Sequence, residues 1–351
     1  MYYRTYRPQT ISEIDNDERQ KLFQSILQNV ENLPHAFLFV GPRGTGKTST
    51  ARILAKVINC EKTVYGGGNG IEPCNQCVSC RAITAGRFLD VHELDAASNR
   101  GVDDIRALRE NVRFAPSQGR YKVYIIDEVH MLTKEAFNAL LKTLEEPPAN
   151  VVFILATTEA DKLPHTIVSR CMHISFQKAQ FDELVHSLKR IAKGENLTVS
   201  DDALKSIAHA SSGSFRDAAK LLEIAVRSTD LSPVSLQAFL TGNTQVEPSK
   251  LLAFILQKNT NEALQYLKKF EDKGGNGRWL TEELLSLLHM AVLTKSGIED
   301  SFENRELLNS VSQKQLAVCI KKMLESYVLA KYSPVDILPL MIMVVEYCDQ
   351  K

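Results

Sequence analysis

The residues whose types and spacing most clearly indicate chemistry form a glycine-rich loop between Gly41 and Thr48. Its pattern is G-x-x-x-x-G-K-[ST], and it lies between an apolar stretch, Ala36 to Val40, and a segment with a helical repeat of apolar residues. In such a loop the backbone N–H groups and the positive end of the helix dipole face one anion. We therefore expect a nucleotide whose phosphates contact Gly41, Pro42, Arg43, Gly44, Thr45, Gly46, Lys47, Thr48 and Ser49.

Two carboxylates follow a second apolar stretch, Lys122 to Ile126. A continuous apolar run is typical of a strand buried on both faces of a parallel sheet, and ligands bind at the carboxyl ends of such strands. Lys47 is then expected to bind the β- and γ-phosphates, and Thr48 to bind Mg²⁺. Asp127 would support the magnesium ion, while Glu128 would polarise a water for attack on the γ-phosphate.

A cluster of cysteines interrupts the chain after the helical segment that follows the loop. Cys60 ends that segment, and Cys74, Cys77 and Cys80 follow at intervals of three residues. Four thiolates can close a tetrahedron, and Cys₄ coordination with no free position is typical of structural zinc. In a reducing compartment this spacing indicates a metal site, not a disulfide framework. We therefore expect one Zn²⁺ ion that stabilises the insertion and takes no part in hydrolysis.

Size and charge limit the kinds of function. The chain has 351 residues, 44% of them hydrophobic, which suggests about two or three domains. With 42 basic and 42 acidic residues the formal net charge is zero, so contact with DNA must come from a local patch or from an assembly. The longest apolar stretch, Ile337 to Val345, is broken by Pro339 and is too short to cross a membrane. We expect a cytoplasmic protein without a membrane segment.

Strand and helix patterns alternate up to about residue 178, which predicts an α/β domain with a helix-covered parallel sheet. Beyond that residue only helical patterns remain. We expect three domains, at 1–178 with the cysteine insertion at 60–80, at 179–242 and at 243–351. In the last of these, one helix is predicted from Val335 to Tyr347.

Several motifs together resemble one protein family. They are the phosphate loop, Asp127-Glu128-Val-His-Met, the cysteine insertion, Leu140 to Pro148 and Ser169-Arg170-Cys171. The chain closely resembles the gamma/tau subunits of the bacterial DNA polymerase III clamp loader, over nearly all of its length. The resemblance implies an AAA+ ATPase with a five-stranded parallel sheet, a small helical lid and an all-α collar through which subunits associate.

The resemblance also implies a function, cofactors and partners. Members of this family bind and hydrolyse ATP to load a sliding clamp onto primed DNA for DNA polymerase III. The implied cofactors are ATP, Mg²⁺ and structural Zn²⁺. The implied partners are clamp-loader subunits of the delta and delta-prime type, the clamp and primed DNA.

Three further site residues follow from the resemblance alone. Thr158 looks like the sensor at the end of the fourth strand, and Arg216 like a second sensor that reaches from the lid to the nucleotide of its own subunit. Arg170 looks like the arginine finger that is offered to ATP in the neighbouring subunit, where a guanidinium stabilises the transition state. Without the resemblance, each arginine would be interpreted as a surface salt bridge.

The proposed DNA contacts also rest on the resemblance. Arg106, Lys142 and Thr166 occupy positions where the family contacts the DNA backbone, although Asn99 and Gly101 stand where some members have basic residues. The chain departs from the family near its start as well. The usual Val-Gly-Gln is replaced by Asp15-Asn16-Asp17, which changes the packing expected around the adenine.

Two alternative functions compete with the ATP-driven motor. A non-hydrolysing subunit of the delta-prime type shares the fold, the zinc insertion and the Ser-Arg-Cys motif, but it lacks a working phosphate loop. Intact Lys47, Thr48, Asp127 and Glu128 argue against it. A different AAA+ machine, such as a branch-migration helicase, gives no reason for the four cysteines or for Ser169-Arg170-Cys171.

Overall fold

The computed structural model describes residues 1–28, 33–63, 71–99, 101–228, 247–272, 274–298, 302 and 305–349. The chain divides into two compact units, Met1–Leu231 and Ser232–Lys351. The domain boundary expected at residue 242 lies outside the described residues.

A five-stranded sheet forms the centre of the first unit, and its strand order is β2-β3-β4-β1-β5. Every strand pair is parallel, which confirms the predicted sheet. The strands are β1 (Ala36–Val40), β2 (Val91–Asp95), β3 (Lys122–Asp127), β4 (Val151–Thr157) and β5 (Met172–Ser175).

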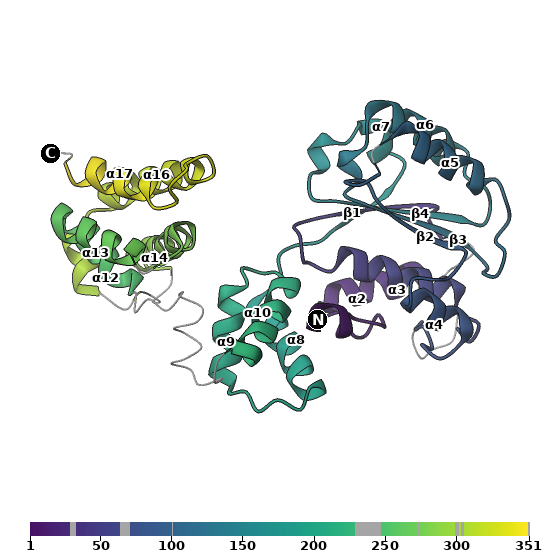
Figure 1. Ribbon diagram of the computed structural model, residues 1–351, viewed down its shortest axis with the longest axis horizontal. Coiled ribbons are helices and arrows are strands. Elements are labelled where there is room, and N and C mark those ends of the chain that lie inside the picture. The colour runs from purple at the N-terminus through teal and green to yellow at the C-terminus, as the bar shows by residue number, and fades with distance from the viewer. Residues whose placement is uncertain are drawn as a thin grey trace. The chain divides into compact units, whose positions relative to one another are not determined.

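The three central strands, β3, β4 and β1, are buried on both faces because they are almost entirely apolar, whereas the edge strands β2 and β5 carry exposed polar residues. Phe37 and Phe39 of β1 pack in one core with residues of α2 and α3, whereas Leu38 points into the opposite core with residues of α5 and α6. Figure 1 shows these two helical layers. One layer contains α2 (Asp17–Leu27), α3 (Lys47–Asn59) and α4 (Val78–Thr84), and the other contains α5 (Val102–Val112), α6 (Lys134–Glu145) and α7 (His165–Val168).

The register of the sheet aligns the strand ends that carry the expected site. Val40 pairs with Thr157, and Ile126 pairs with Leu155. The carboxyl ends of β1, β4 and β3 are therefore neighbours at one edge of the sheet. The phosphate loop, Asp127 and Thr158 all follow directly from these ends.

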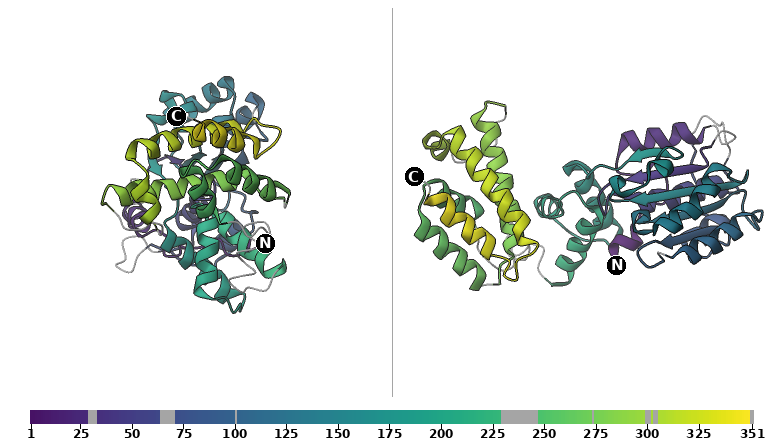
Figure 2. Two further views of the ribbon diagram at one scale, coloured as in Figure 1. Left: turned by 90° about the vertical axis from the view of Figure 1, so that its left-hand side faces the viewer. Right: turned by 90° about the horizontal axis from the view of Figure 1, so that it is seen from above.

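The described part of the first unit also contains a helical module of α8 (Phe181–Gly194), α9 (Asp201–Ala210) and α10 (Phe215–Ser228). A short N-terminal helix, α1 (Tyr2–Thr5), packs against α10, and the Tyr6 hydroxyl donates to Glu195 Oε1 across 2.8 Å. Figures 1 and 2 show the N-terminus beside these helices. The sequence patterns did not predict this contact between the start of the chain and the helical module.

In its described residues the second unit is all-α, as predicted, and its helices share one apolar core. They are α12 (Pro248–Leu256), α13 (Thr260–Asp272), α14 (Gly277–Lys295), α15 (Arg305–Ser310), α16 (Gln313–Ala330) and α17 (Leu338–Cys348). The last helix begins at Leu338 and not at Val335, because Pro339 lacks an N–H group and suits the first turn. Among the described residues, no helix combines the length and the apolar composition needed to cross a membrane.

Candidate functional site

The phosphate loop curls around the ammonium group of Lys47. Lys47 Nζ donates to the carbonyl oxygens of Gly41 and Pro42, at 2.7 and 2.9 Å. Gly44 and Gly46 have φ angles of 77° and 96°, a region that favours glycine. The Lys47 side chain is buried, and this burial lowers its pKa, against the opposing effects of Glu128 and Asp127. The loop therefore holds a positive charge where a phosphate group can displace the two carbonyl oxygens.

The two carboxylates at the end of β3 lie next to this loop. Thr48 Oγ1 donates to Asp127 Oδ2 across 2.8 Å. Glu128 Oε1 accepts from Arg43 Nε at 3.2 Å, and Glu128 Oε2 accepts from Thr158 Oγ1 at 3.3 Å. A hydroxyl and a carboxylate in contact offer the oxygen ligands that Mg²⁺ prefers. Asp127 thus contacts the Thr48 hydroxyl, whereas Glu128 contacts Arg43 of the loop and Thr158.

Glu128 is held in an uncommon backbone conformation. Its φ of 49° lies in the left-handed region, which costs a residue with a Cβ atom roughly 1 kcal/mol. His130, a residue to which the sequence analysis gave no role, lies behind it. His130 Nδ1 is 3.6 Å from Glu128 Oε2 and 2.9 Å from Thr157 Oγ1, and Nε2 is 3.3 Å from Glu159 Oε1. The nearly buried imidazole therefore joins Glu128 to the end of β4. In the sequence, only the position of His130, two residues after Glu128, indicates that it could belong to the site.

The loop forms the floor of a cleft of about 360 Å³. Its lining also includes Asp95 and Asp127 at strand ends, Tyr3, Arg7 and Asp15 from the start of the chain, and Arg190 and Arg216 from α8 and α10. The N-terminal residues, α8 and α10 therefore offer a nucleotide a lining beyond the loop that would hold its phosphates. The family resemblance placed Asp15 near the adenine, but the sequence did not predict that Tyr3 and Arg7 also reach the cleft.

Arg216 reaches the cleft from the helical module. Its guanidinium carbon lies 5.0 Å from the ring centroid of Tyr3, close enough for a cation–π contact. The neighbouring Phe215 N–H donates to the Gly44 carbonyl across 3.0 Å. A Cβ atom on Gly44 would lie only 2.0 Å from Ser214 Oγ, so the module and the loop fit closely only because residue 44 is glycine.

Arg170 does not line the described cleft. Its Nη2 lies 2.7 Å from Glu145 Oε1, and its Nη1 donates to the Thr166 carbonyl across 2.7 Å. About a third of its side chain is exposed (34%). The structure thus brings together the other residues expected at the nucleotide and leaves Arg170 on the surface, available to a neighbouring molecule.

The three residues expected to contact DNA lie on α5, α6 and α7, which cover the same face of the sheet (Figure 1). Arg106, Lys142 and Thr166 are all exposed. Arg106 Nη1 forms an ion pair with Asp103 at 3.1 Å, so its charge is partly neutralised.

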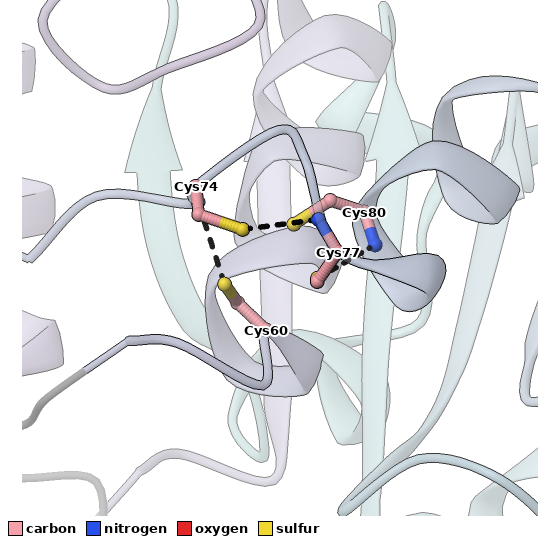
Figure 3. A group of neighbouring side chains, drawn as sticks. All are labelled: Cys60, Cys74, Cys77 and Cys80. Atoms are coloured by element: carbon pink, nitrogen blue, oxygen red, sulfur yellow. Dashed lines mark hydrogen bonds between the residues drawn. The ribbon is translucent and has the colours of Figure 1, made fainter.

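The four cysteines of the insertion converge at one point (Figure 3), with their sulfur atoms all within 4.8 Å of one another. Cys60 follows the last turn of α3, whereas Cys77 and Cys80 lie at the start of α4. Backbone N–H groups point at the sulfurs: those of Cys77 and Cys80 lie 3.3 Å from the Sγ atoms of Cys74 and Cys77. Burial raises the pKa of the Cys60 thiol, but hydrogen bonds from Cys74 and Thr63 outweigh it and lower the pKa to about 6. This cluster fits a tetrahedral metal ion.

The fold and the cleft define the class of the protein. A parallel sheet with a phosphate loop after β1, acids at the end of β3 and a helical lid that brings an arginine to the cleft describes a nucleotide-binding protein of the AAA+ class. The family model described as DNA polymerase III, delta subunit matches residues 15–180. The model described as DNA polymerase III clamp loader subunit, ATPase lid domain matches residues 183–230.

Individual relatives define the family more narrowly. The tau subunit of DNA polymerase III from Bacillus subtilis is 44% identical, over 86% of this chain and 53% of its own length. The tau subunit from Escherichia coli is 40% identical, over 83% of this chain and 45% of its own length. The gamma subunit from Buchnera aphidicola (Baizongia pistaciae) is 37% identical, over 83% of this chain and 78% of its own length. The chain belongs to the gamma/tau family of DNA polymerase III subunits.

The chain spans about half the length of the tau subunits that it matches. Among solved structures, the RuvB Holliday junction branch migration motor of Thermotoga maritima is 20% identical and covers 72% of this chain and 79% of its own, with a TM-score of 0.49. That structural likeness is too weak to bear on function.

Proposed function

We propose that this protein is an ATP-hydrolysing motor subunit of a bacterial replicative clamp loader, which loads a sliding clamp onto primed DNA for DNA polymerase III. The observation that carries the proposal is the contact of Thr48 Oγ1 with Asp127 Oδ2 beside the loop that surrounds Lys47. The names of the relatives, subunits of DNA polymerase III, support the replication role. A replication role supports a cytoplasmic location.

The phosphate end of the cleft would work as follows. The N–H groups of the loop, Gly41 to Ser49, bind the phosphates of ATP, and Lys47 exchanges its two carbonyl partners for phosphate oxygens. Thr48 and Asp127 supply the oxygen ligands for Mg²⁺. When bound, this ion neutralises charge on the β- and γ-phosphate oxygens. These residues need little movement to do so, because their side chains already converge.

Glu128 is suited to act on the attacking water. Its carboxylate is held by Arg43 and Thr158, and His130 lies behind it. In this role Glu128 accepts the water's proton. Thr158 responds to the γ-phosphate and passes this on through its hydrogen bond to Glu128 Oε2. Arg216 adds positive charge to the same nucleotide from the lid.

Arg170 would act between subunits. It lies outside the described lining of its own cleft and is held by one carboxylate at a partly exposed position. Exposed ion pairs are worth about 0–1 kcal/mol, so Glu145 can release the guanidinium at little cost. An arginine that meets ATP only in the neighbouring subunit makes hydrolysis depend on assembly.

Self-association is proposed to use the second unit. Leu338, Ile342 and Val345 are spaced along one face of α17 and are each more than a third exposed, and Leu324 and Val328 of α16 are about half exposed or more. Exposed apolar rows of this kind mark interaction surfaces. This collar would join the chain to further copies and to delta- and delta-prime-type subunits.

The cysteine cluster is assigned to one structural Zn²⁺ ion held by Cys60, Cys74, Cys77 and Cys80, because four sulfurs leave no open coordination position. Contacts of Arg106, Lys142 and Thr166 with DNA phosphates are proposed on the same face of the sheet. The domain limits at 1–178, 179–242 and 243–351 also remain proposals.

The rate of ATP hydrolysis, measured with and without the clamp and primed DNA, tests the function. We expect hydrolysis that the clamp and primed DNA together stimulate strongly and that Lys47→Ala abolishes. No hydrolysis by the intact protein under any of these conditions would instead support the non-hydrolysing, delta-prime-like alternative.

A further inference from the structure

Residues 7–16, which we call the N-terminal strap, pass between the nucleotide cleft, the cysteine insertion and the lid. Arg7, Pro8, Ile14 and Asp15 line the cleft. Residues 9–13 between them are absent from the described lining, and the N–H groups of Ile11 and Ser12 are bonded to the insertion. The strap therefore has one set of residues at the nucleotide cleft and another set that contacts the insertion.

Glu72, two residues before Cys74, holds the middle of the strap. Its Oε2 accepts the N–H of Ile11 and its Oε1 accepts the N–H of Ser12, both at 2.7 Å. Hydrogen bonds to an ionised carboxylate are roughly twice as strong as neutral ones. One side chain of the insertion thus fixes two consecutive peptide groups of the strap.

A buried lysine makes a second link. Lys56, on the helix that begins at the phosphate loop, is 1% exposed. Its Nζ donates to the carbonyl and the side-chain oxygen of Gln9, each at 2.7 Å, and to Asn75 Oδ1 at 2.8 Å. Burying an ammonium group is costly unless all of its hydrogen bonds are made. Gln9 of the strap and Asn75 of the cysteine loop are therefore held by the same cation.

The lid holds the far end of the strap. The Asp15 side chain is 4% exposed, and its oxygens accept from Arg190 at 2.9 and 3.2 Å and contact His186 Nδ1 at 2.8 Å. Arg190 also donates to the Glu13 carbonyl, and Asn16 Nδ2 donates to Glu183 Oε1 at 2.7 Å. The three lid partners are spaced along one face of α8.

The cysteines form the buried centre of the insertion. In the described part of the chain, Cys60, Cys77 and Cys80 form a buried cluster of their own, with Cys74 packed against it. We propose that the strap couples this cluster to the nucleotide cleft, with Glu72 as a positioning residue that acts through the strap on the sugar and base of the nucleotide. This inference rests on the nucleotide site of the proposed function.

The test compares two isosteric variants of the insertion. Glu72→Gln replaces one of two carboxylate acceptors by an amide donor. Glu61→Gln is the matched control, since the described hydrogen bonds of its side chain go to Ser79 of α4. Affinities for ATP and for inorganic tripolyphosphate are measured by titration calorimetry. Amide hydrogen exchange of α8 is measured without nucleotide.

We expect Glu72→Gln to weaken ATP binding about tenfold, roughly the effect of one lost charge-assisted hydrogen bond. Tripolyphosphate affinity should stay unchanged, because no described hydrogen bond joins the strap to the phosphate loop, residues 41–49. Exchange in α8 should rise, and chelation of the metal should reproduce all three results. Glu61→Gln should match wild type.

Equal ATP affinity and equal α8 exchange in both variants and wild type would overturn the coupling. Wild-type protein that binds neither ATP nor tripolyphosphate would contradict the proposed function instead, and α8 exchange would still decide the coupling. If Glu72→Gln does not fold, Asp15→Asn tests the link from the other end. Because coupling is reciprocal, Asp15→Asn should speed amide hydrogen exchange at Ile11 and Ser12. Unchanged exchange at these two residues would overturn the inference.

Discussion

The guanidinium of Arg170 lies 2.7 Å from the carboxylate of Glu145, at the end of α6 and outside the described lining of the chain's own nucleotide cleft. The pair is partly exposed, with 34% and 48% of the two side chains accessible. Such a pair holds an arginine in place without binding it strongly. Arg170 can therefore exchange Glu145 for a partner in a neighbouring subunit, which experiments on mixed subunits can test.

Arg170→Ala should bind ATP about as well as wild type but hydrolyse it about 10³-fold more slowly, because a finger supplied by another subunit stabilises the transition state. Lys47→Ala retains Arg170 but should no longer bind ATP in its own cleft. Mixing the two inactive proteins should partly restore hydrolysis. A mixture that stays inactive, although fluorescence shows that subunits exchange, would contradict action between subunits.

Lys47→Ala should weaken ATP binding roughly a hundredfold or more, because removal of a buried charge partner costs about 3 kcal/mol. Titration calorimetry provides the measurement. Lys21→Ala, which removes an exposed lysine from α2, is the control and should bind normally. Unchanged affinity in Lys47→Ala would rule out the phosphate loop as the binding site.

Glu128→Gln should retain ATP binding and lower turnover by about 10²- to 10⁴-fold, because an amide cannot accept the water's proton. Single-turnover hydrolysis separates the chemical step from binding. Glu135→Gln is the control: it lies at an exposed position in the first turn of α6 and is absent from the described cleft lining. Equal turnover in the Glu128 variant and wild type would remove Glu128 from the mechanism.

Freshly purified protein should contain one zinc ion per chain, and Cys77→Ser or Cys80→Ser should release it, because each variant removes one of four ligands. Elemental analysis measures the content. Cys171→Ser should keep the ion, since Cys171 is not part of the cluster. Protein without zinc, prepared in the absence of chelators, would leave the convergence of the four sulfurs unexplained.

Asp90→Asn should lower the free energy of unfolding by about 1–3 kcal/mol near pH 7. The fully buried carboxylate accepts N–H groups from Ser117, Gln118 and Gly119, at 2.8, 2.6 and 2.7 Å. Burial raises the pKa of Asp90, but these hydrogen bonds outweigh it and lower the pKa below its ordinary value.

The direction of the pH effect follows from that shift. A carboxyl group with a depressed folded-state pKa stabilises the fold above its unfolded pKa of about 3.9, and this contribution fades as the pH falls below it. Denaturant unfolding, followed by circular dichroism, should therefore show the two proteins converge in acid. Asp103→Asn, at an exposed position, should behave as wild type; a constant difference between wild type and Asp90→Asn down to pH 2 would contradict the assignment.

Local patterns in the sequence determined the phosphate loop, the acids after β3, the cysteine cluster and the alternation of strands and helices. Each of these depends on residue types within a few positions, such as a glycine at a positive φ or an apolar run in a buried strand. The one clear error of this kind, the start of α17, arose where a helical pattern continued across Pro339.

Only the tertiary structure decided what surrounds the loop. The contacts of Asp15 with Arg190, of Glu72 with Ile11 and of Arg170 with Glu145 join residues that are far apart in the chain. A carboxylate has no periodicity that reveals its partner, because hydrogen bonds and ion pairs depend on distances that arise only after the sheet and helices have packed. The sequence alone therefore predicted where phosphates would bind, and the packed chain located the strap, His130 and the surface position of Arg170.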